Sequence, residues 1–405
     1  MKIPPLPKLP RKSTAKIDQA ILRDEKILEN FRVIQSAYLQ KAFDLALYLL
    51  TIASAFLGFI AMRTGGTSEI IYVTIGIAII LSLLNTRDLF QRFPDVLLAL
   101  WRQKLFSSPT EYHSKSETDS PRGDEYLLNF FGETKDLLHH NFASGLFGFI
   151  GFAVIGWAVW VLDGDWLTHI GALFQSIPLV VIFTLLPRLI FLFAGVICGM
   201  MGWRVLVIAR QIAALGSTFD VNLQINHPDG CAGLSPIGDL CLILTYCLVP
   251  FPIFVGMWLI FVNLLNPAYL KLQPASFTFF VSTLQALIVP LVAIDFLGFF
   301  YPPISIHNSM LRAKSRLSIR LDVISQQINA IHAHLLSNAP NLDPKEGTAL
   351  EEKIDFLKRV YGRFMPVPTW PYRGGHLLSL TSSQIIPIIG MLSSIAGFFR
   401  MVFMK

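Results

Sequence analysis

Long apolar stretches divide the chain, and they constrain its fold more than any other feature of the sequence. Six long stretches and a weaker seventh one lie near residues 43–62, 69–85, 143–162, 182–203, 239–263, 276–300 and 380–399. A helix of about 20 residues covers the ~30 Å hydrocarbon core of a bilayer. The 405 residues are 53% hydrophobic and only 15% charged. We therefore expect an all-α integral membrane protein with six or seven transmembrane helices.

The positive charges fall on one side of a simple topology. Of the 33 Lys and Arg residues, 28 lie in four segments: nine in 1–41, seven in 86–142, two in 204–237 and ten in 302–378. Cytoplasmic segments are enriched in Lys and Arg, so we expect these four segments, and the N-terminus, on the cytoplasmic side of the cell (inner) membrane. The net charge of +6 follows from this sorting. No basic run has the aromatic or glycine pattern of a nucleic-acid reader, so no nucleic-acid partner is expected.

The apolar run from Ile170 to Trp203 is the most ambiguous part of the topology. Two full crossings there would place the ten positive residues of 302–378 on the outer side. The charge rule argues against this, so we expect one crossing, preceded by an interfacial or re-entrant piece. The last apolar stretch is either a seventh span or an interfacial or re-entrant helix.

Spans and loops together give eight predicted regions. In order they are a cytosolic N-terminal helix (1–41), a first transmembrane hairpin (42–85), a cytosolic segment with an interfacial helix at Val96–Phe106 (86–142), transmembrane helices with the re-entrant or interfacial piece (143–203), a cytosolic loop (204–237), a second transmembrane hairpin (238–301), a cytosolic helical hairpin (302–378) and a C-terminal membrane segment (379–405).

The cytosolic helical hairpin is predicted from two apolar stripes on either side of a Pro-rich turn. The first stripe comprises Leu317, Leu321, Ile324, Ile328, Ile331 and Leu335, and the second comprises Leu350, Ile354, Leu357, Tyr361 and Phe364. Alternating steps of four and three residues form a seam for helix pairing, as in a coiled coil. We expect two antiparallel helices that together form a cytosolic helical module.

Glycines are expected to bring two of the membrane helices close together. They recur on shared helix surfaces of the third and fourth spans, at Gly145, Gly148 and Gly151 and at Gly195, Gly199 and Gly202. Small residues at this spacing let helix backbones approach closely in a bilayer.

Two ionisable residues lie well inside predicted spans and are candidates for a transport path. They are Arg188 in the fourth span and Asp295 in the sixth. A charge at the bilayer centre costs at least ~2.5 kcal/mol, so each residue needs a partner or a watery cavity. The alternative is a structural ion pair or snorkelling to an interface, and the different predicted depths argue against direct pairing of the two.

The loop His227-Pro228-Asp229-Gly230-Cys231 offers candidate ligands for a bound group. His227, Asp229 and Cys231 are the ligand candidates, but one tight cluster supplies at most three ligands in awkward geometry. Pro-Asp-Gly is also typical of a turn with glycine at positive φ. We therefore favour a turn scaffold and predict no metal and no cofactor. The sequence contains no CxxC motif, and we do not expect its four cysteines to form a disulfide framework.

The sequence contains none of the motifs by which common enzyme classes are found, so we predict that the protein is not an enzyme. A phosphate-binding glycine loop, GxSxG, HExxH and a Gly-rich dinucleotide turn are all absent from the sequence. Two functions remain. The first is a channel- or transporter-like protein, expected to be a homo-oligomer, whose cytosolic helices gate or assemble it. The second is a non-conducting scaffold or signalling anchor whose helical seam docks an unknown protein partner.

Two segments resemble a known group of sequences. The loop HPDGCAGLSPIGDL, at residues 227–240, and the segment MPVPTWP, at 365–371, are similar to segments of uncharacterised bacterial polytopic membrane proteins. The resemblance implies a bacterial inner-membrane protein with a helical cytosolic part. It brings no activity and no functional residue with it.

Overall fold

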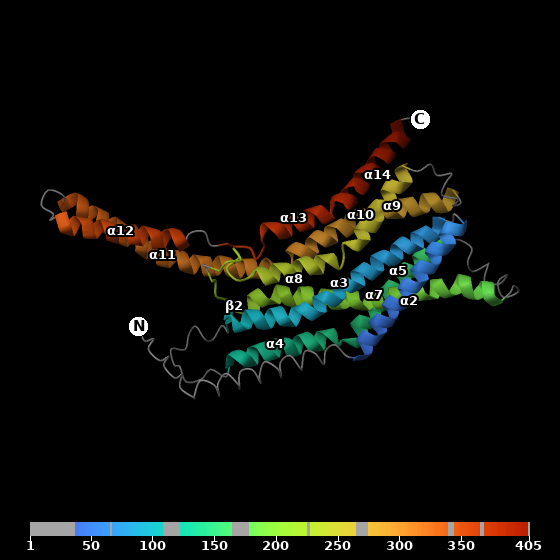
Figure 1. Cartoon of the computed structure of the whole chain (residues 1–405), viewed down its shortest axis with the longest axis horizontal. Coiled ribbons are helices and arrows are strands. Elements are labelled where there is room, and N and C mark those ends of the chain that lie inside the picture. The colour runs from blue at the N-terminus through green and yellow to red at the C-terminus, as the bar shows by residue number, and fades with distance from the viewer. Residues whose placement is uncertain are drawn as a thin grey trace, which may run out of the picture. The chain divides into compact units, whose positions relative to one another are not determined.

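The computed structural model of the protein is shown in Figure 1, and its described residues are 37–64, 67–107, 122–163, 178–224, 227–264, 274–338, 344–364 and 368–403. The chain divides into two compact units. Unit 1 comprises Met1–Leu83, Phe90–Leu98 and Ser120–Val207, and unit 2 comprises Leu84–Leu89, Ala99–Asp119 and Ile208–Lys405.

Nearly all of the described structure is helical. In chain order the elements are α2 (Ala37–Thr64), α3 (Thr67–Arg102), β1 (Phe106–Ser107), α4 (Arg122–Leu138), α5 (Asn141–Asp163), α7 (Pro178–Thr218), β2 (Asp220–Val221), α8 (Ser235–Tyr246), α9 (Pro250–Leu264), α10 (Pro274–Phe300), α11 (Ile304–Asn338), α12 (Pro344–Phe364), α13 (Gly374–Ser383) and α14 (Ile385–Phe403). The two short strands pair antiparallel, with Phe106 opposite Val221.

Several of these helices have the length and the apolar composition of a membrane span. Among the described residues, six helices are long and apolar enough to cross a membrane, or seven if α8 and α9, which meet at an angle of 46°, form one span. The seven correspond to the seven apolar stretches of the sequence. The predicted all-α membrane fold with six or seven transmembrane helices is therefore confirmed.

In unit 1, glycines bring α5 and α7 into backbone contact. A Cβ atom added to Gly151 would overlap the carbonyl oxygen of Gly195, and one added to Gly199 would overlap that of Phe147. Such approach is possible only where side chains are missing, because the backbones themselves form the interface. Gly148 also lies close, but a Cβ on Gly145 or Gly202 would meet nothing within 4 Å. The predicted close approach is thus correct for the inner glycines and wrong for the two at the ends.

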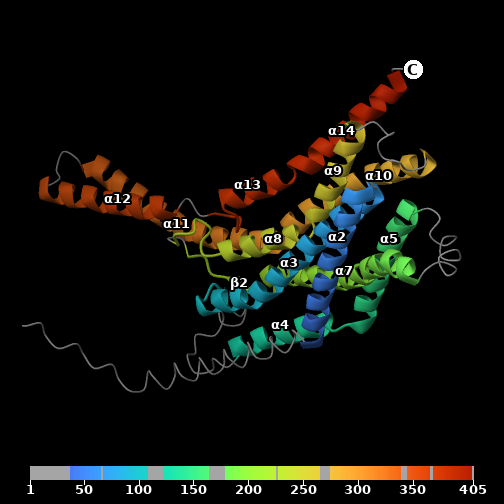
Figure 2. The same cartoon turned by 45° about the vertical axis from the view of Figure 1, so that its right-hand side comes forward.

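In unit 2, α9 and α14 make a similar contact. The two helices lie side by side (Figures 1 and 2). A Cβ added to Gly256 would lie 2.8 Å from the Cα atom of Pro387, and one added to Gly390 would lie 2.5 Å from the Cα atom of Gly256. The helix α10 packs against α8, α9 and α14. This packing buries Asp295, which α10 carries.

The predicted helical hairpin is formed by α11 and α12, which pack against each other (Figure 1). Leu321 and Ile354, one from each stripe, are 8% and 4% exposed. The described members of both stripes are buried or half-buried, whereas most residues between them are exposed. The seam of alternating four- and three-residue steps therefore faces the partner helix, as predicted. The predicted turn at residues 339–343 and the predicted N-terminal helix up to residue 36 lie outside the described residues.

Two helices continue further than the sequence suggests. The helix α3 runs from Thr67 to Arg102 with Pro94 inside it, so Val96–Phe106 is not a separate interfacial helix. The apolar residues of the segment Val96–Phe106 are buried in protein, as the 2% exposure of Leu97 and the 0% exposure of Leu105 show. Likewise, α7 continues to Thr218, so the first part of the predicted loop 204–237 is helical. Polar composition marks the end of an apolar span, but it does not by itself end a helix.

Candidate functional site

The loop between β2 and α8 is organised around Asp229. Oδ1 of this carboxylate accepts hydrogen bonds from the N–H groups of Cys231 and Gly233 at 2.9 and 3.0 Å. Oδ2 accepts one from the N–H of Ser235 at 3.1 Å. Ser235 begins α8, and the N-cap residue Leu234 makes no side-chain cap. Asp229 therefore caps this helix from six residues upstream.

The surroundings of Asp229 favour its charged form. Its side chain is 3% exposed, and Nδ1 of His227 lies 2.9 Å from Oδ1. Burial by itself would raise the pKa of this carboxyl group, but the three backbone N–H donors and His227 outweigh burial and lower the pKa to about 2. Asp229 is therefore an anion that holds the loop together.

The loop also needs backbone conformations that side chains disfavour. Gly230 and Gly233 have φ values of 67° and 91°, and Ala232 has a φ of 55°. A Cβ on Gly233 would lie 2.9 Å from the methyl carbons of Leu105. Alanine in the left-handed region costs about 1–2 kcal/mol. The hydrogen bonds to Asp229 hold the neighbouring residues Cys231 and Gly233 and thereby stabilise this conformation.

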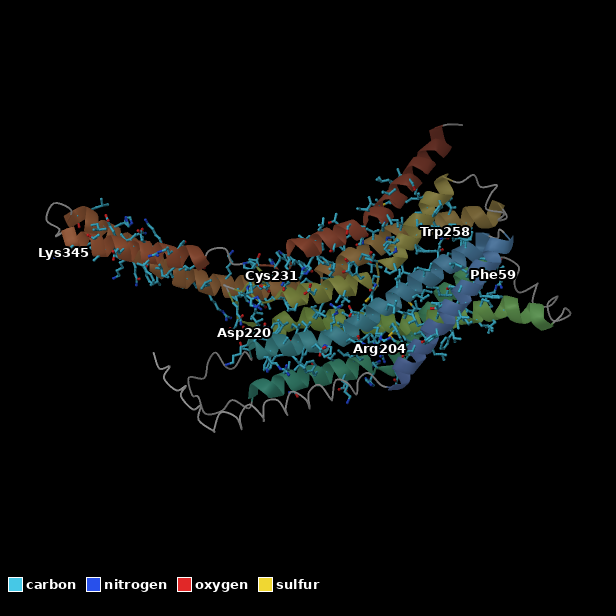
Figure 3. The ribbon with its side chains drawn as sticks, in the orientation of Figure 1. Phe59, Arg204, Asp220, Cys231, Trp258 and Lys345 are labelled. Atoms are coloured by element: carbon cyan, nitrogen blue, oxygen red, sulfur yellow. The ribbon has the colours of Figure 1, made fainter. Side chains whose placement is uncertain are left out.

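The three candidate ligands of the loop do not form a metal site. No group of three or more His, Cys, Asp or Glu side chains in the described part of the chain could hold a metal ion. The oxygen atoms of Asp229 accept backbone hydrogen bonds. Cys231, which Figure 3 labels, is only 1% exposed. Burial, the largest cause, and the Asp229 carboxylate raise the pKa of the Cys231 thiol, which Arg373 partly offsets. The geometry favours the turn scaffold over ligand binding at His227, Asp229 and Cys231.

The start of α8 is attached to the start of α13. The Arg373 guanidinium donates a hydrogen bond to the Ser235 hydroxyl at 2.6 Å. The His376 imidazole pairs with Asp239, with 2.8 Å between Nε2 and Oδ1. Gly238 lies next to this contact. A Cβ atom added to it would overlap the Pro371 carbonyl oxygen and lie 2.9 Å from the His376 ring. The loop 227–240 and the segment that follows residue 367 therefore fold onto each other.

The protonation pattern of His376 follows from its two contacts. Its Nδ1 accepts a hydrogen bond from the backbone N–H of Arg373 at 3.1 Å. An imidazole nitrogen that accepts carries no proton, so Nε2 carries the hydrogen and donates it to Asp239. The two hydrogen bonds together fix the orientation of the ring.

A stack of aromatic rings lies beside this junction. Trp370 stacks on His307 with ring centroids 4.1 Å apart, and Tyr372 stacks on Phe299 at 4.3 Å. His307 Nδ1–H donates to the Thr369 carbonyl at 2.6 Å, and the Tyr372 hydroxyl donates to the Phe299 carbonyl. The stack fixes the segment 368–373 against the end of α10 and the start of α11.

The most buried charged side chain in the described part of the chain is Asp295 on α10, at 1% exposure. Its Oδ2 accepts a hydrogen bond from Nε2 of Gln384 at 3.0 Å. Gln384 is also 1% exposed, and it is the residue between α13 and α14. The sequence expectation that Asp295 needs a partner is met, among the described residues, by an amide and not by an oppositely charged side chain.

Two helix interruptions belong to the elements that pack around α10. The helices α8 and α9 meet at 46°, and α9 begins with Pro250. The helices α13 and α14 are separated by Gln384, and Pro387 lies in the first turn of α14. Proline lacks an N–H donor, so these positions interrupt the ladder of backbone hydrogen bonds. Pro187 and Pro290, by contrast, lie inside continuous helices.

Arg188, the second transport-path candidate, lies within α7 and is half-buried. It belongs to unit 1, whereas Asp295 belongs to unit 2. Its role in a path stays a prediction.

The polar residues that complete the site were missed in the sequence. Gln384 is an amide inside a predicted span, which is a usable signal. His376 and Arg373 stand outside any motif, and nothing local marks them as partners of Asp239 and Ser235.

No protein-family model, curated protein or solved structure matches the chain.

Proposed function

We propose that the protein is a channel- or transporter-like membrane protein, and that Asp295 is the polar residue of its path. The observation that carries this proposal is the Asp295–Gln384 hydrogen bond of 3.0 Å between two side chains that are each 1% exposed. A carboxyl group at such depth is costly, and residues of this kind commonly belong to ion or proton pathways.

The interrupted helices support the same function. Gln384 joins α13 to α14. The bent pair α8 and α9, also in unit 2, packs against these two helices. Discontinuous helices near polar groups are a recurring feature of transporter binding sites. The backbone contact between Gly256 and Gly390 holds together α9 and α14, the two helices that follow these interruptions.

The helices α11 and α12 form the module that we propose to gate or assemble the protein. The distribution of Lys and Arg supports a cytoplasmic position for this module and for the N-terminus. The resemblance of residues 227–240 and 365–371 supports a bacterial inner membrane, and the regular seam of α11 and α12 supports coiled-coil-like pairing.

The test of this function is ion flux in proteoliposomes. Wild-type protein, Asp295→Asn and Arg188→Gln are compared at equal incorporation, with Asp322→Asn, an exposed carboxylate on α11, as the matched control. A path predicts wild-type flux above that of protein-free liposomes, and an altered rate or selectivity in Asp295→Asn but not in the control. Flux equal to that of empty liposomes for every ion tested contradicts the proposal.

A second candidate function is a non-conducting scaffold. The observation that favours it is a group of apolar side chains on the outer faces of α11 and α12: Ile319 is 64% exposed, Val323 52%, Leu336 80% and Phe356 59%. A surface of this kind is typical of a contact with another protein or a second copy.

Cysteine cross-linking distinguishes the scaffold from a solvated hairpin. In a chain with the native cysteines replaced by alanine, Leu336→Cys is expected to form a disulfide-linked dimer in the membrane if the face binds a second copy. Glu351→Cys, at an exposed position of α12, is the control. Equal cross-linking at both positions would mean that collisions, not a specific contact, join the chains.

A further inference from the structure

The Asp295–Gln384 pair contains two buried oxygen atoms to which no described residue donates a hydrogen bond. Gln384 uses its Nε2–H group to reach Oδ2 of Asp295. Within the described residues, Oδ1 of Asp295 and Oε1 of Gln384 have no hydrogen-bond partner. Both side chains are 1% exposed, so bulk water does not reach these atoms. Buried acceptors of this kind are costly unless a donor is supplied.

A single proton held between these two atoms would satisfy both. A carboxylic acid and a primary amide are complementary, because the acid O–H donates to the amide carbonyl while the amide N–H donates to the acid. The second of these bonds is already present in the structure. We propose that Asp295 and Gln384 form an intramembrane proton-binding site, with the proton on Oδ1 of Asp295 shared with Oε1 of Gln384. The proton comes from water, and the carboxylate becomes a neutral acid.

Among the described side chains of the elements packed against α10, no positive group compensates a charge on Asp295. The titratable or charged residues on α8, α9 and α14, which pack against α10, are Asp239, Cys241, Tyr246 and Arg400. Asp239 pairs with His376, and the Arg400 side chain lies outside the described side chains. Gln384 is the hydrogen-bond partner of Asp295 in the described part of the chain, and it is neutral. The neutral acid is therefore the form that this site stabilises best.

A metal cation fits the pair less well than a proton. Hard cations are surrounded by about six or more oxygen ligands, and this pair has two oxygen atoms free to coordinate. No cluster of metal-ligating side chains exists in the described residues. A proton needs only the two atoms that the pair provides.

The physiological role of this site rests on the proposed transport function, in which a proton bound here would be the coupling ion or the transported ion. Proton binding is tested first without any transport assay. Infrared difference spectra of purified full-length protein in lipid nanodiscs are recorded while the pH is raised. We expect a carbonyl band of a protonated carboxylic acid at neutral pH, and we expect its loss at alkaline pH.

Three variants assign the band. Asp295→Asn should abolish it, whereas Asp322→Asn should leave it unchanged. Gln384→Met should move it to higher frequency, because the acid loses its hydrogen bonds to the amide. Circular dichroism of each variant checks that the helices are retained. Absence of the band from wild-type protein at neutral pH overturns the inference, as does a band that survives Asp295→Asn or disappears when Na⁺ or K⁺ is added at constant pH.

Proton flux then separates the two proposals. In proteoliposomes with a pH-sensitive dye inside, Asp295→Asn is expected to slow proton uptake by at least about tenfold, as removal of an intramembrane relay residue should. A band that is assigned to Asp295 without any flux would retain the proton site and reject the transport function. Flux without the band would retain the transport function and reject the proton site.

Discussion

Nε2 of His376 donates a hydrogen bond to Oδ1 of Asp239 at 2.8 Å, although 137 residues separate the two in the chain. The imidazole is 8% exposed and the carboxylate 53%. Asp239 lies in the first turns of α8 and His376 in the first turn of α13. The contact therefore joins the N-terminal ends of α8 and α13. The helix α8 packs against α10, which carries Asp295, and α13 ends immediately before Gln384.

The Gly238→Ala substitution should disrupt this junction. A Cβ at position 238 would overlap the Pro371 carbonyl and lie 2.9 Å from the His376 ring. Overpacking against backbone typically costs about 1–3 kcal/mol, so we expect a lower midpoint of thermal unfolding in detergent. Gly202→Ala is the matched control, because a Cβ there meets nothing within 4 Å. Equal stability of wild type and Gly238→Ala would show that the segment following residue 367 is not fixed on α8.

The Asp229→Asn substitution should destabilise the protein in a pH-dependent way. The lowered pKa of about 2 means that the charged carboxylate stabilises the folded state above the unfolded-state pKa of ~3.9. This contribution is lost as the pH falls from ~4 towards ~2, and at neutral pH it amounts to about 2–3 kcal/mol. Thermal unfolding of both proteins at neutral and acidic pH measures it, and the difference between them should shrink on acidification. A difference that grows instead would contradict the assigned role.

Cys231 should resist labelling in the folded protein. The thiol is buried, and burial together with the Asp229 carboxylate raises its pKa, so little of the reactive thiolate is present at neutral pH. With the other three cysteines replaced by alanine, a water-soluble maleimide is expected to react at least about tenfold more slowly than with Ser318→Cys in the same background. Ser318 is exposed on α11. Rapid labelling of Cys231 in folded protein would mean that the loop opens.

The α11–α12 pair should depend on Ile354 more than on its neighbour Phe356. Ile354 is 4% exposed and Phe356 59% exposed on the same helix. Truncation of a buried isoleucine costs about 2–5 kcal/mol, so Ile354→Ala should increase hydrogen exchange of α12 amides, whereas Phe356→Ala should leave it close to wild type. Similar exchange in both variants would show that the seam contributes little to the pairing of the helices.

Local composition was enough to find the spans and the α11–α12 seam. Every predicted apolar stretch corresponds to a helix of membrane-spanning composition or to the bent α8–α9 pair, because hydropathy and heptad spacing are properties of consecutive residues. Composition predicted the ends of helices less well than their positions. The helix α3, for example, continues through Pro94 to Arg102 because packing of its apolar face outweighs the loss of one backbone hydrogen bond.

The polar partnerships required the tertiary structure. The sequence marked Asp295 as a buried charge that needs a partner, and Gln384 as a polar residue in a span, but it could not show that these two residues, 89 positions apart, are partners. It marked Asp229 as part of a turn, yet the capping of α8 and the contact of Arg373 with Ser235 depend on how the chain folds back. Hydropathy is summed along the chain, whereas a hydrogen bond depends on distances in space. The sequence therefore determined the class of fold, and only the packing of α8, α10, α13 and α14 decided which polar groups meet inside it.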